Sequence, residues 1–223
     1  ALVELLARLV DINGLDRIRL NSIEPGYLGD VLIDFVAVTP KICRHFHVPL
    51  QSGDDHILKR MGRRYNRAYY AERIERIAAL IPNCAIGADV MVGFPGETDT
   101  HFAQTRDLLA DLPMTYLHVF SYSLREGTPA ERLDDHQQKD TKKGRAGELI
   151  ALGEQKRLAF HQRFIGLRLE VLCEGRQDSA TGLHVGLSDN YVKTLFPGPA
   201  QPNDVVTIAI DRAREDLVFG ARI

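Results

Sequence analysis

Polar side chains stand where predicted strands end, which is the usual place for a ligand in a parallel α/β protein. Glu24 closes a first predicted strand, Gln51 and Ser52 follow a second, and Asp89 lies in a third. Carboxylates accept hydrogen bonds from ribose hydroxyls or an ammonium group, and an arginine such as Arg63 can hold a carboxylate through two hydrogen bonds. These residue types predict a site for a ligand that contains a ribose and an amino acid.

Each of these residues also has a purely structural interpretation. Glu24 precedes Pro25 and can cap a following helix. Asp89 can be a buried strand residue that backbone groups satisfy, and residues 93–96 form a turn under either interpretation. Their shared placement at strand ends favours the ligand site, although the spacing alone does not name the ligand.

The elements that must position these residues alternate between strand and helix. The apolar periodicity predicts strands at 17–23, 44–48, 84–92 and 116–122, and helices at 2–10, 29–38, 54–61, 66–81 and 99–112. Short connectors between them indicate βα units and a parallel sheet, either doubly wound or an arc of a barrel. We assign this α/β part to residues 1–136.

The pattern changes beyond this α/β part. Residues 137–165 are typical of one long polar helix, which we interpret as a linker. Residues 166–223 hold short alternating strands, separated by turns rich in Gly, Pro, Asp and Asn. That pattern predicts a small all-β barrel of the OB kind.

The composition is that of an ordinary globular protein. Of the 223 residues, 44% are hydrophobic and 26% are charged, and the net charge of −2 does not indicate a nucleic-acid partner. No apolar run approaches the roughly 20 residues that cross a bilayer, and no signal peptide is visible, so we expect a cytoplasmic protein without membrane contact. The chain begins inside an amphipathic helix without a start methionine, and we expect it to be part of a longer protein.

Three cysteines, Cys43, Cys84 and Cys173, lie far apart in apolar, strand-like stretches. We expect them to be buried, reduced thiols, and we predict no metal site built from them.

Four segments closely resemble the radical-SAM methylthiotransferases: residues 47–53 (HVPLQSG), 58–63 (LKRMGR), 89–98 (DVMVGFPGET) and 118–129 (HVFSYSLREGTP). The resemblance covers essentially the whole chain. It implies a partial TIM-like (βα) barrel in the first part and a TRAM domain, a small OB-like RNA-binding barrel, in the last.

The resemblance also implies a cofactor site for S-adenosylmethionine (SAM). Other radical-SAM enzymes, including the oxygen-independent coproporphyrinogen oxidases, hold this cofactor with Glu, Gln, Arg and Asp at similar separations. The corresponding positions, with their neighbours, are Glu24, Gln51, Ser52, Arg63, Asp89, Gly93, Phe94 and Phe120. Gln51 and Asp89 are expected at the ribose, Arg63 at the methionine carboxylate, and the last three positions beside the adenine.

The Cys-x-x-x-Cys-x-x-Cys motif that holds the family's reactive 4Fe-4S cluster is absent. We therefore predict that the intact protein carries 4Fe-4S clusters whose ligands lie outside this chain. This chain alone is expected to be inactive, with no catalytic residue of its own. A barrel without its first strands also exposes a sheet edge, which promotes association. The sulfur and electron donors cannot be inferred.

The last part of the chain bears on the substrate. Residues 189–193 (DNYVK) are similar to the Asp-Asn-Tyr-x-Lys of the subclass that acts on N6-threonylcarbamoyladenosine at position 37, in the anticodon stem-loop of tRNA. Residues 117–120 fit that subclass too. The alternatives are an isopentenyladenosine or ribosomal protein S12 methylthiotransferase, or a non-catalytic RNA-binding protein that lacks the cluster.

Two basic stretches, residues 59–76 and 139–163, could follow a phosphate backbone, and the second includes Lys142 and Lys143. Solvated helix faces explain such stretches equally well. Acids slightly outnumber bases after residue 165, so we expect RNA contact there from Asn190, Tyr191 and Lys193 through stacking and hydrogen bonds. The alternative is that Tyr191 is core and Asn190 lies in a turn.

Overall fold

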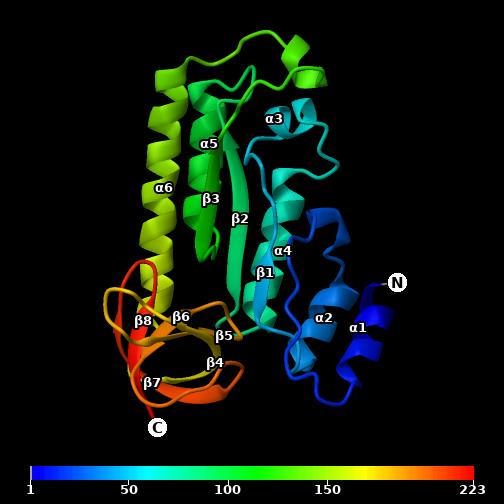
Figure 1. Cartoon of the computed structure of the whole chain (residues 1–223). Helices are drawn as coiled ribbons and strands as arrows, with labels where there is room; N and C mark the ends of the chain where they lie inside the picture. The colour runs from blue at the N-terminus through cyan, green and yellow to red at the C-terminus, as the bar shows by residue number, and fades with distance from the viewer. Residues whose placement is uncertain (1) are drawn as a thin grey trace.

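Three parallel strands form the centre of the first part of the chain (Figure 1). In the computed structural model, which describes residues 2–223, the sheet has the order β1 (His45–His47), β2 (Ala85–Val92) and β3 (Tyr116–Ser121). The register pairs His47 with Gly87, and Asp89 with His118. This parallel α/β arrangement confirms the predicted fold class for this part.

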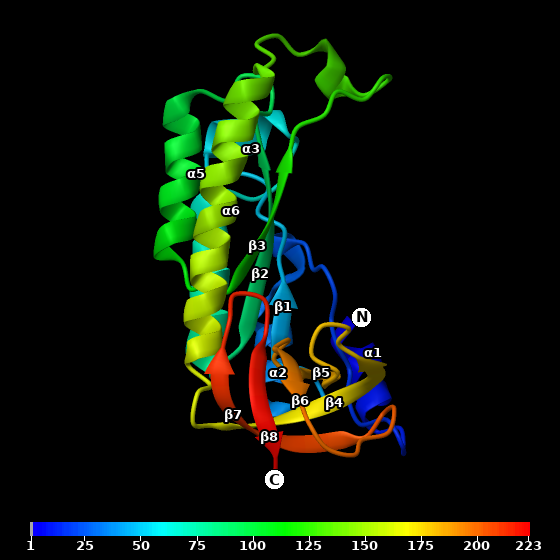
Figure 2. The same ribbon diagram turned by 60° about the vertical axis from the view of Figure 1, so that its left-hand side comes forward.

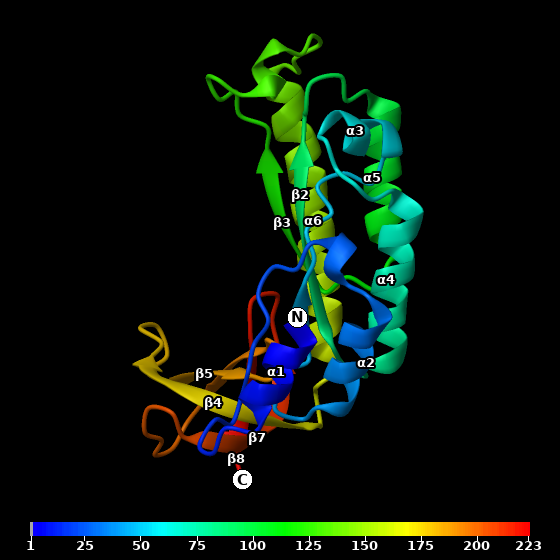
Figure 3. The ribbon, with the colours of Figure 1, turned by 90° about the vertical axis from the view of Figure 1, so that its right-hand side faces the viewer.

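Helices pack on one face of this sheet and leave the other face open above the last part of the chain (Figures 2 and 3). They are α1 (Leu2–Val10), α2 (Asp30–Val38), α3 (Asp55–Arg60), α4 (Arg67–Leu80), α5 (Asp99–Asp111) and α6 (Lys139–Gln162), with 3-10 turns η1 (Pro25–Tyr27) and η2 (Pro129–Arg132). Alternate residues of β2 from Ile86 to Val92 point into the helical layer and are almost fully buried. The remaining residues of β2 therefore face the open side, which we call the inner face.

Local sequence explains where several helices begin. Asp54 accepts a hydrogen bond from the backbone N–H of Ile57, Asn66 does the same for Tyr69, and Thr98 caps α5. Each is an Asp, Asn or Thr at the N-cap, where a side-chain oxygen satisfies a free backbone donor. Across residues 2–223 no helix is long and apolar enough to cross a membrane.

The predicted first strand, residues 17–23, does not form a regular ladder. It runs along β1 through a single bridge between Ile18 and Ile42 and a hydrogen bond from Ile23 N to His47 O at 2.9 Å. These contacts still cover the free edge of β1. The uncovered edge of the sheet is therefore that of β3.

The last part is a closed five-stranded barrel with the order β4-β5-β6-β8-β7. Its strands are β4 (Arg168–Gln177), β5 (His184–Ser188), β6 (Lys193–Phe196), β7 (Val205–Ala213) and β8 (Val218–Arg222). The barrel core includes Val171, Cys173 and Ile208, and it continues into Phe160 and Phe164 at the end of α6. The predicted small all-β barrel is confirmed, while its assignment as a TRAM domain stays a prediction.

The β-barrel docks under the amino-terminal ends of β1 and β2 (Figure 1) through the turn between β5 and β6. Asp189 of this turn accepts hydrogen bonds of 2.7 and 3.1 Å from the Arg44 guanidinium. The Asn190 side chain donates to the backbone carbonyl of Asn83 at 3.1 Å. Arg19 donates to the carbonyls of Ser188 and Asp189. The turn is thus the main polar connection between the two parts.

Candidate functional site

A His–Asp–His cluster lies on the inner face, with one residue from each strand of the sheet. His47 Nε2 is 3.0 Å and His118 Nδ1 is 3.3 Å from the same Asp89 oxygen, Oδ1. Strand periodicity brings them together, because these positions point to the same side in paired strands. His47 is buried, Asp89 is partly exposed, and His118 is about half exposed, at 53% of its side chain. The cluster can therefore be reached from the open side of the sheet.

A buried tyrosine connects this cluster to a second histidine. The Tyr116 hydroxyl is 3.2 Å from His47 Nδ1 and 2.7 Å from His45 Nε2. Burial lowers the pKa of His45 to about 3, with a smaller contribution from the nearby Arg19 charge, so this ring is neutral near pH 7. Burial also raises the pKa of Tyr116 well above its usual range. Tyr116 therefore acts as a neutral hydroxyl that can donate one hydrogen bond and accept another.

Tyr191 of the β-barrel closes the lower end of this inner face. Its ring stacks on His45 with the ring centroids 4.3 Å apart, and the Arg19 guanidinium lies 5.0 Å from its centroid. A recess of about 350 Å³ remains among these rings, Asp89 and His118. Tyr191 adopts a φ of 65°, a left-handed conformation that the surrounding contacts must hold in place.

Two of the residues predicted for SAM form an ion pair at the carboxyl ends of the strands. Arg63 Nη1 is 2.9 Å from Glu24 Oε1, beside a cavity of about 430 Å³ that Tyr65 also lines. Gln51 lies next to Asp89, since its backbone N–H donates to the Asp89 carbonyl at 2.9 Å. The structure thus brings Glu24 to Arg63 and Gln51 to Asp89, and that these two pairs form one cofactor site stays a prediction.

Two other predicted cofactor residues are buried and serve the fold. Ser52 is fully buried, and its hydroxyl lies 3.3 Å from that of Thr105 and accepts from the Asp54 N–H at 3.2 Å. Phe94 is only 6% exposed and packs edge-on against Tyr122. Neither side chain is available to a ligand, which corrects the sequence expectation for Ser52 and for the ring of Phe94.

The remaining two positions predicted near adenine differ in accessibility. Gly93 has a φ of +72°, and a Cβ there would lie 2.2 Å from Cγ of Lys142, so the lysine stem occupies the space that the glycine opens. Phe120 lies at the end of β3 on the inner face and is 53% exposed. Phe120 is therefore available to a ligand, while Gly93 is covered on this side.

The residues present fit the amino-acid part of SAM but not a 4Fe-4S cluster. Arg63 can hold a carboxylate and Glu24 an ammonium group, and the buried Nε of Arg63 has no hydrogen-bond partner. The three cysteines are all buried, with Cys173 inside the β-barrel core and Cys43 and Cys84 at the amino-terminal ends of β1 and β2. As predicted, they cannot serve as a cluster ligand set beside the SAM residues.

Of the residues predicted to contact RNA, Asn190 is excluded by burial. It has no exposed surface, and its side chain accepts from the Ser188 hydroxyl at 2.6 Å and donates to Asn83. Its role is to hold the turn against the first part of the chain, which corrects the RNA expectation. Tyr191 is 42% exposed and combines a docking contact with an accessible ring face.

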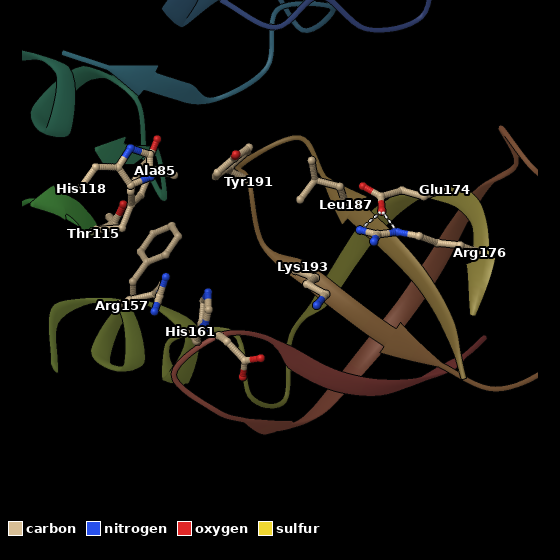
Figure 4. Close-up of a pocket in the computed structure, with 13 residues that line it drawn as sticks. Ala85, Thr115, His118, Arg157, His161, Glu174, Arg176, Leu187, Tyr191 and Lys193 are labelled. Carbon is tan, nitrogen blue, oxygen red and sulfur yellow. Dashed lines mark hydrogen bonds and ion pairs between the residues drawn. The ribbon is translucent and has the colours of Figure 1, made fainter. Parts of the chain in front are cut away.

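The predicted lysines lie at opposite ends of the molecule. Lys193 lines a cavity of about 330 Å³ between α6, the inner face and the β-barrel, together with Arg157, Arg176 and Tyr191 (Figure 4). Lys142 donates to the carbonyl of Tyr122 at 3.1 Å, near the carboxyl ends of the strands, and its neighbour Lys143 is exposed. These cations therefore do not form one continuous basic surface.

Sequence reasoning missed a charge network around the buried Arg145–Glu97 pair, which holds α6 in place. Arg145 of α6 binds Glu97 at 2.6 Å and Asp99 at 2.6 Å, and Glu97 accepts from the Gly93 N–H at 2.7 Å. It also missed His45, His47 and Tyr116. The alternation of His45 and His47 across one buried strand was the available signal, because alternate residues share a face.

The chain is similar to known proteins in sequence and in fold. Residues 1–109 match the radical SAM superfamily. The chain is 38% identical to the tRNA-2-methylthio-N(6)-dimethylallyladenosine synthase of Desulfitobacterium hafniense, over 97% of this chain and 49% of the relative. It is 36% identical to the threonylcarbamoyladenosine tRNA methylthiotransferase MtaB of Bacillus subtilis, over 84% of this chain and 42% of the relative.

A solved structure shows the same fold. Coproporphyrinogen III oxidase (HemN) of Escherichia coli, a radical SAM enzyme, superimposes with a TM-score of 0.55 at 16% identity, over 86% of this chain and 49% of that one. This chain spans about half the length of the curated relatives it matches. Residues 1–109 are thus similar to the radical SAM superfamily, and the chain is similar to tRNA methylthiotransferases over about half of their length.

Proposed function

We propose that the chain is the SAM- and tRNA-binding part of a methylthiotransferase that modifies C2 of N6-threonylcarbamoyladenosine at position 37 of tRNA, in the cytoplasm. The observation that carries this proposal is the Glu24–Arg63 pair at the carboxyl ends of the strands, within the segment that matches the radical SAM superfamily. A carboxylate and a guanidinium 2.9 Å apart are complementary to the ammonium and carboxylate of a bound amino acid.

The chain's own residues would position the cofactor. Arg63 would hold the methionine carboxylate, Glu24 the ammonium, and Asp89 and Gln51 the ribose. Asp89 can do this because both histidines share its Oδ1, which leaves Oδ2 for a ribose hydroxyl. Phe120 offers an exposed ring near the adenine. When bound together with a 4Fe-4S cluster held elsewhere in the intact protein, SAM supplies the radical chemistry.

Several accessible residues support a role in RNA binding. Lys193 and Tyr191 line the cavity between the β-barrel and the inner face, where a cation and an aromatic ring suit phosphate and base (Figure 4). Lys143 would meet phosphate at the far end of α6, while Lys142 is engaged with Tyr122. We propose the anticodon stem-loop as the RNA that spans these positions.

The substrate class rests on the similarity of residues 189–193 to the threonylcarbamoyladenosine subclass. The relatives include enzymes named for dimethylallyladenosine and for threonylcarbamoyladenosine. Since Asp189 and Asn190 also dock the β-barrel, their residue types serve the fold as well.

The test is mass spectrometry of tRNA nucleosides from a strain that lacks the complete gene. We expect the 2-methylthio derivative of threonylcarbamoyladenosine to disappear and its unmodified precursor to accumulate. Loss of the 2-methylthio derivative of dimethylallyladenosine instead would keep the reaction class and overturn the substrate. No change in any methylthio nucleoside would overturn the proposal.

A further inference from the structure

We propose that His47, Asp89 and His118 form a binding site for one divalent transition-metal ion of the Zn²⁺, Co²⁺ or Fe²⁺ class. This site is built from residues of this chain alone and does not depend on the proposed function. One ligand atom from each residue, two imidazole nitrogens and a carboxylate oxygen, lies within 4.8 Å of the others. Two histidines and one carboxylate are a donor set that such ions prefer.

The distances suit an ion. A tetrahedral ion with bonds of about 2.0–2.1 Å places neighbouring ligand atoms about 3.3 Å apart. The two nitrogen–oxygen separations are 3.0 and 3.3 Å, both to Asp89 Oδ1. The third separation, between the two histidines, is at most 4.8 Å. It can shorten through a small rotation of His118, since half of this side chain is exposed and free of packing on that side.

An outer shell fixes the buried ligand. Metal-binding histidines usually hydrogen-bond through their other ring nitrogen, which orients the ring and sets its tautomer. His47 does so through Nδ1, which lies 3.2 Å from the Tyr116 hydroxyl. The Tyr116 hydroxyl can donate to His47 Nδ1 when Nε2 of His47 carries a proton. It can accept from Nδ1 when Nε2 of His47 binds an ion, because it can then donate to His45 instead. The same residues can therefore satisfy both the metal-free and the metal-bound states.

The site leaves coordination positions open. The three ligands come from one face of a sheet, and the recess of about 350 Å³ in front of them is lined by Asn21, Ser22 and Tyr191. Three protein ligands with an open position are the arrangement of ions that bind water or a substrate atom, whereas structural sites are closed by four. We infer that a bound ion would present at least one exchangeable position to this recess.

The probe for this site is Co²⁺ alone, titrated into the purified 223-residue chain after chelator treatment. We expect one equivalent to bind with visible d–d absorption, no thiolate charge-transfer band, and displacement by Zn²⁺. Asp89→Asn and His118→Gln should each weaken binding at least about tenfold, and Tyr116→Phe, which removes the hydroxyl contact to His47 together with that to His45, by about tenfold. Asp89 is partly buried, so the Asp89→Asn variant can misfold. In that case His118→Gln, which alters a half-exposed residue, is the deciding variant.

The matched control is His56→Gln. His56 and His101 form a close histidine pair away from the inner face, with ring centroids 5.3 Å apart, and a nonspecifically bound ion would choose them. This variant should bind Co²⁺ like the unaltered chain. The proposal is overturned if the folded chain shows no d–d band, if a thiolate band appears, or if His118→Gln binds as well as the unaltered chain. Loss of binding in His56→Gln would overturn it too.

Discussion

Gly87 makes room for the hydrogen-bond chain of the inner face. A Cβ at this position would lie 2.0 Å from the Tyr116 ring, so the tyrosine can cross β2 to reach His45 and His47 only because residue 87 has no side chain. The overlap is with a buried ring that cannot move aside without losing both contacts. The absence of a side chain at Gly87 thus allows the hydrogen bonds among Tyr116, His45 and His47.

We expect Gly87→Ala to lower the free energy of unfolding by about 1–3 kcal/mol through overpacking. Gly147→Ala in α6 is the matched control, because nothing lies within 4 Å of its Cβ position and alanine favours helix. Urea unfolding of both variants measures the difference. Equal stabilities for the two variants would contradict the role given to Gly87.

His45 should make the stability of the fold depend on pH. Its pKa falls from 6.5 to about 3 on folding, chiefly because burial disfavours the charged ring. Below pH 6.5 the unfolded chain therefore binds a proton that the folded chain excludes until about pH 3. The contribution of His45 to the free energy of unfolding is fully present above pH 6.5. As the pH drops below 6.5, this contribution decreases by up to about 1.4 kcal/mol per pH unit, and about 2 kcal/mol is lost at pH 5.

Urea unfolding at pH 7 and pH 5 tests this dependence. His45→Gln keeps a hydrogen-bonding group near Tyr116 but cannot titrate, so its loss of stability between the two pH values should be smaller by about 2 kcal/mol. Burial also lowers the pKa of His161. Its contribution to the pH dependence is the same in both proteins and therefore cancels in the comparison. Equal pH dependence in the two proteins would exclude His45 as the source.

Motif spacing predicted some residue roles and could not predict others. Glu24 and Gln51 follow predicted strands, and their placement was predictable because parallel strands share one carboxyl edge, whereas Asp89 lies inside β2 and Arg63 follows α3. Ser52 and Asn190 have polar side chains that are fully buried. The sequence did not reveal this, because their partners, Thr105 and Asn83, are far away along the chain.

At the scale of elements, the turn between β5 and β6 holds the β-barrel against the α/β part through hydrogen bonds. Asn190 joins it to Asn83, and Asp189 joins it to Arg44. Asn190→Ala would remove the hydrogen bond from the buried Ser188 hydroxyl, which would keep only its bonds to Val192, and the hydrogen bond to the Asn83 carbonyl, at a cost of about 1–3 kcal/mol. We expect urea unfolding to show this loss, together with faster trypsin cleavage between the two parts.

Asp211→Ala is the control for this prediction, because Asp211 is exposed in β7 of the same barrel, where a substitution should cost little. If Asn190→Ala unfolds like Asp211→Ala and resists trypsin equally, the turn does not hold the two parts together.

The periodicity predicted most helices and strands but not how the first strand pairs. Residues 17–23 alternate as a strand should, yet they make only one bridge to the sheet. Arg17 and Arg19 instead turn their side chains to the carbonyls of Glu170 and Ser188 in the β-barrel. Such a contact between distant parts of the chain overrides local preference, and periodicity carries no information about it.

At the scale of the whole molecule, β3 is the exposed edge of the sheet, with Phe120 beside it about half exposed. The expected open edge was the one that the missing first strands would leave, but residues 17–23 run along β1, and the edge without a paired strand is that of β3 at the other end of the sheet. Unpaired strand edges join to one another. We expect this chain to self-associate with rising concentration in multi-angle light scattering, and a monomer across the whole range would contradict this prediction.

The arrangement of the two parts was not predictable from composition. The sequence indicated an α/β part, a helix and a small barrel, and each is present. Their docking depends on a few side chains such as Arg44 and Asp189, whose pairing across 145 residues no local pattern encodes. The cavity between the inner face and the β-barrel, with the RNA contacts proposed there, follows from this docking.

The central claim is that these residues belong to an enzyme that methylthiolates tRNA. The most direct test incubates the complete, cluster-loaded protein with SAM, a sulfur source and a reductant, using anticodon stem-loop RNA that carries threonylcarbamoyladenosine or dimethylallyladenosine. We predict that mass spectrometry detects a methylthio group on the first RNA only, and that Arg63→Ala abolishes it. Cleavage of SAM without methylthio product on either RNA would contradict the account.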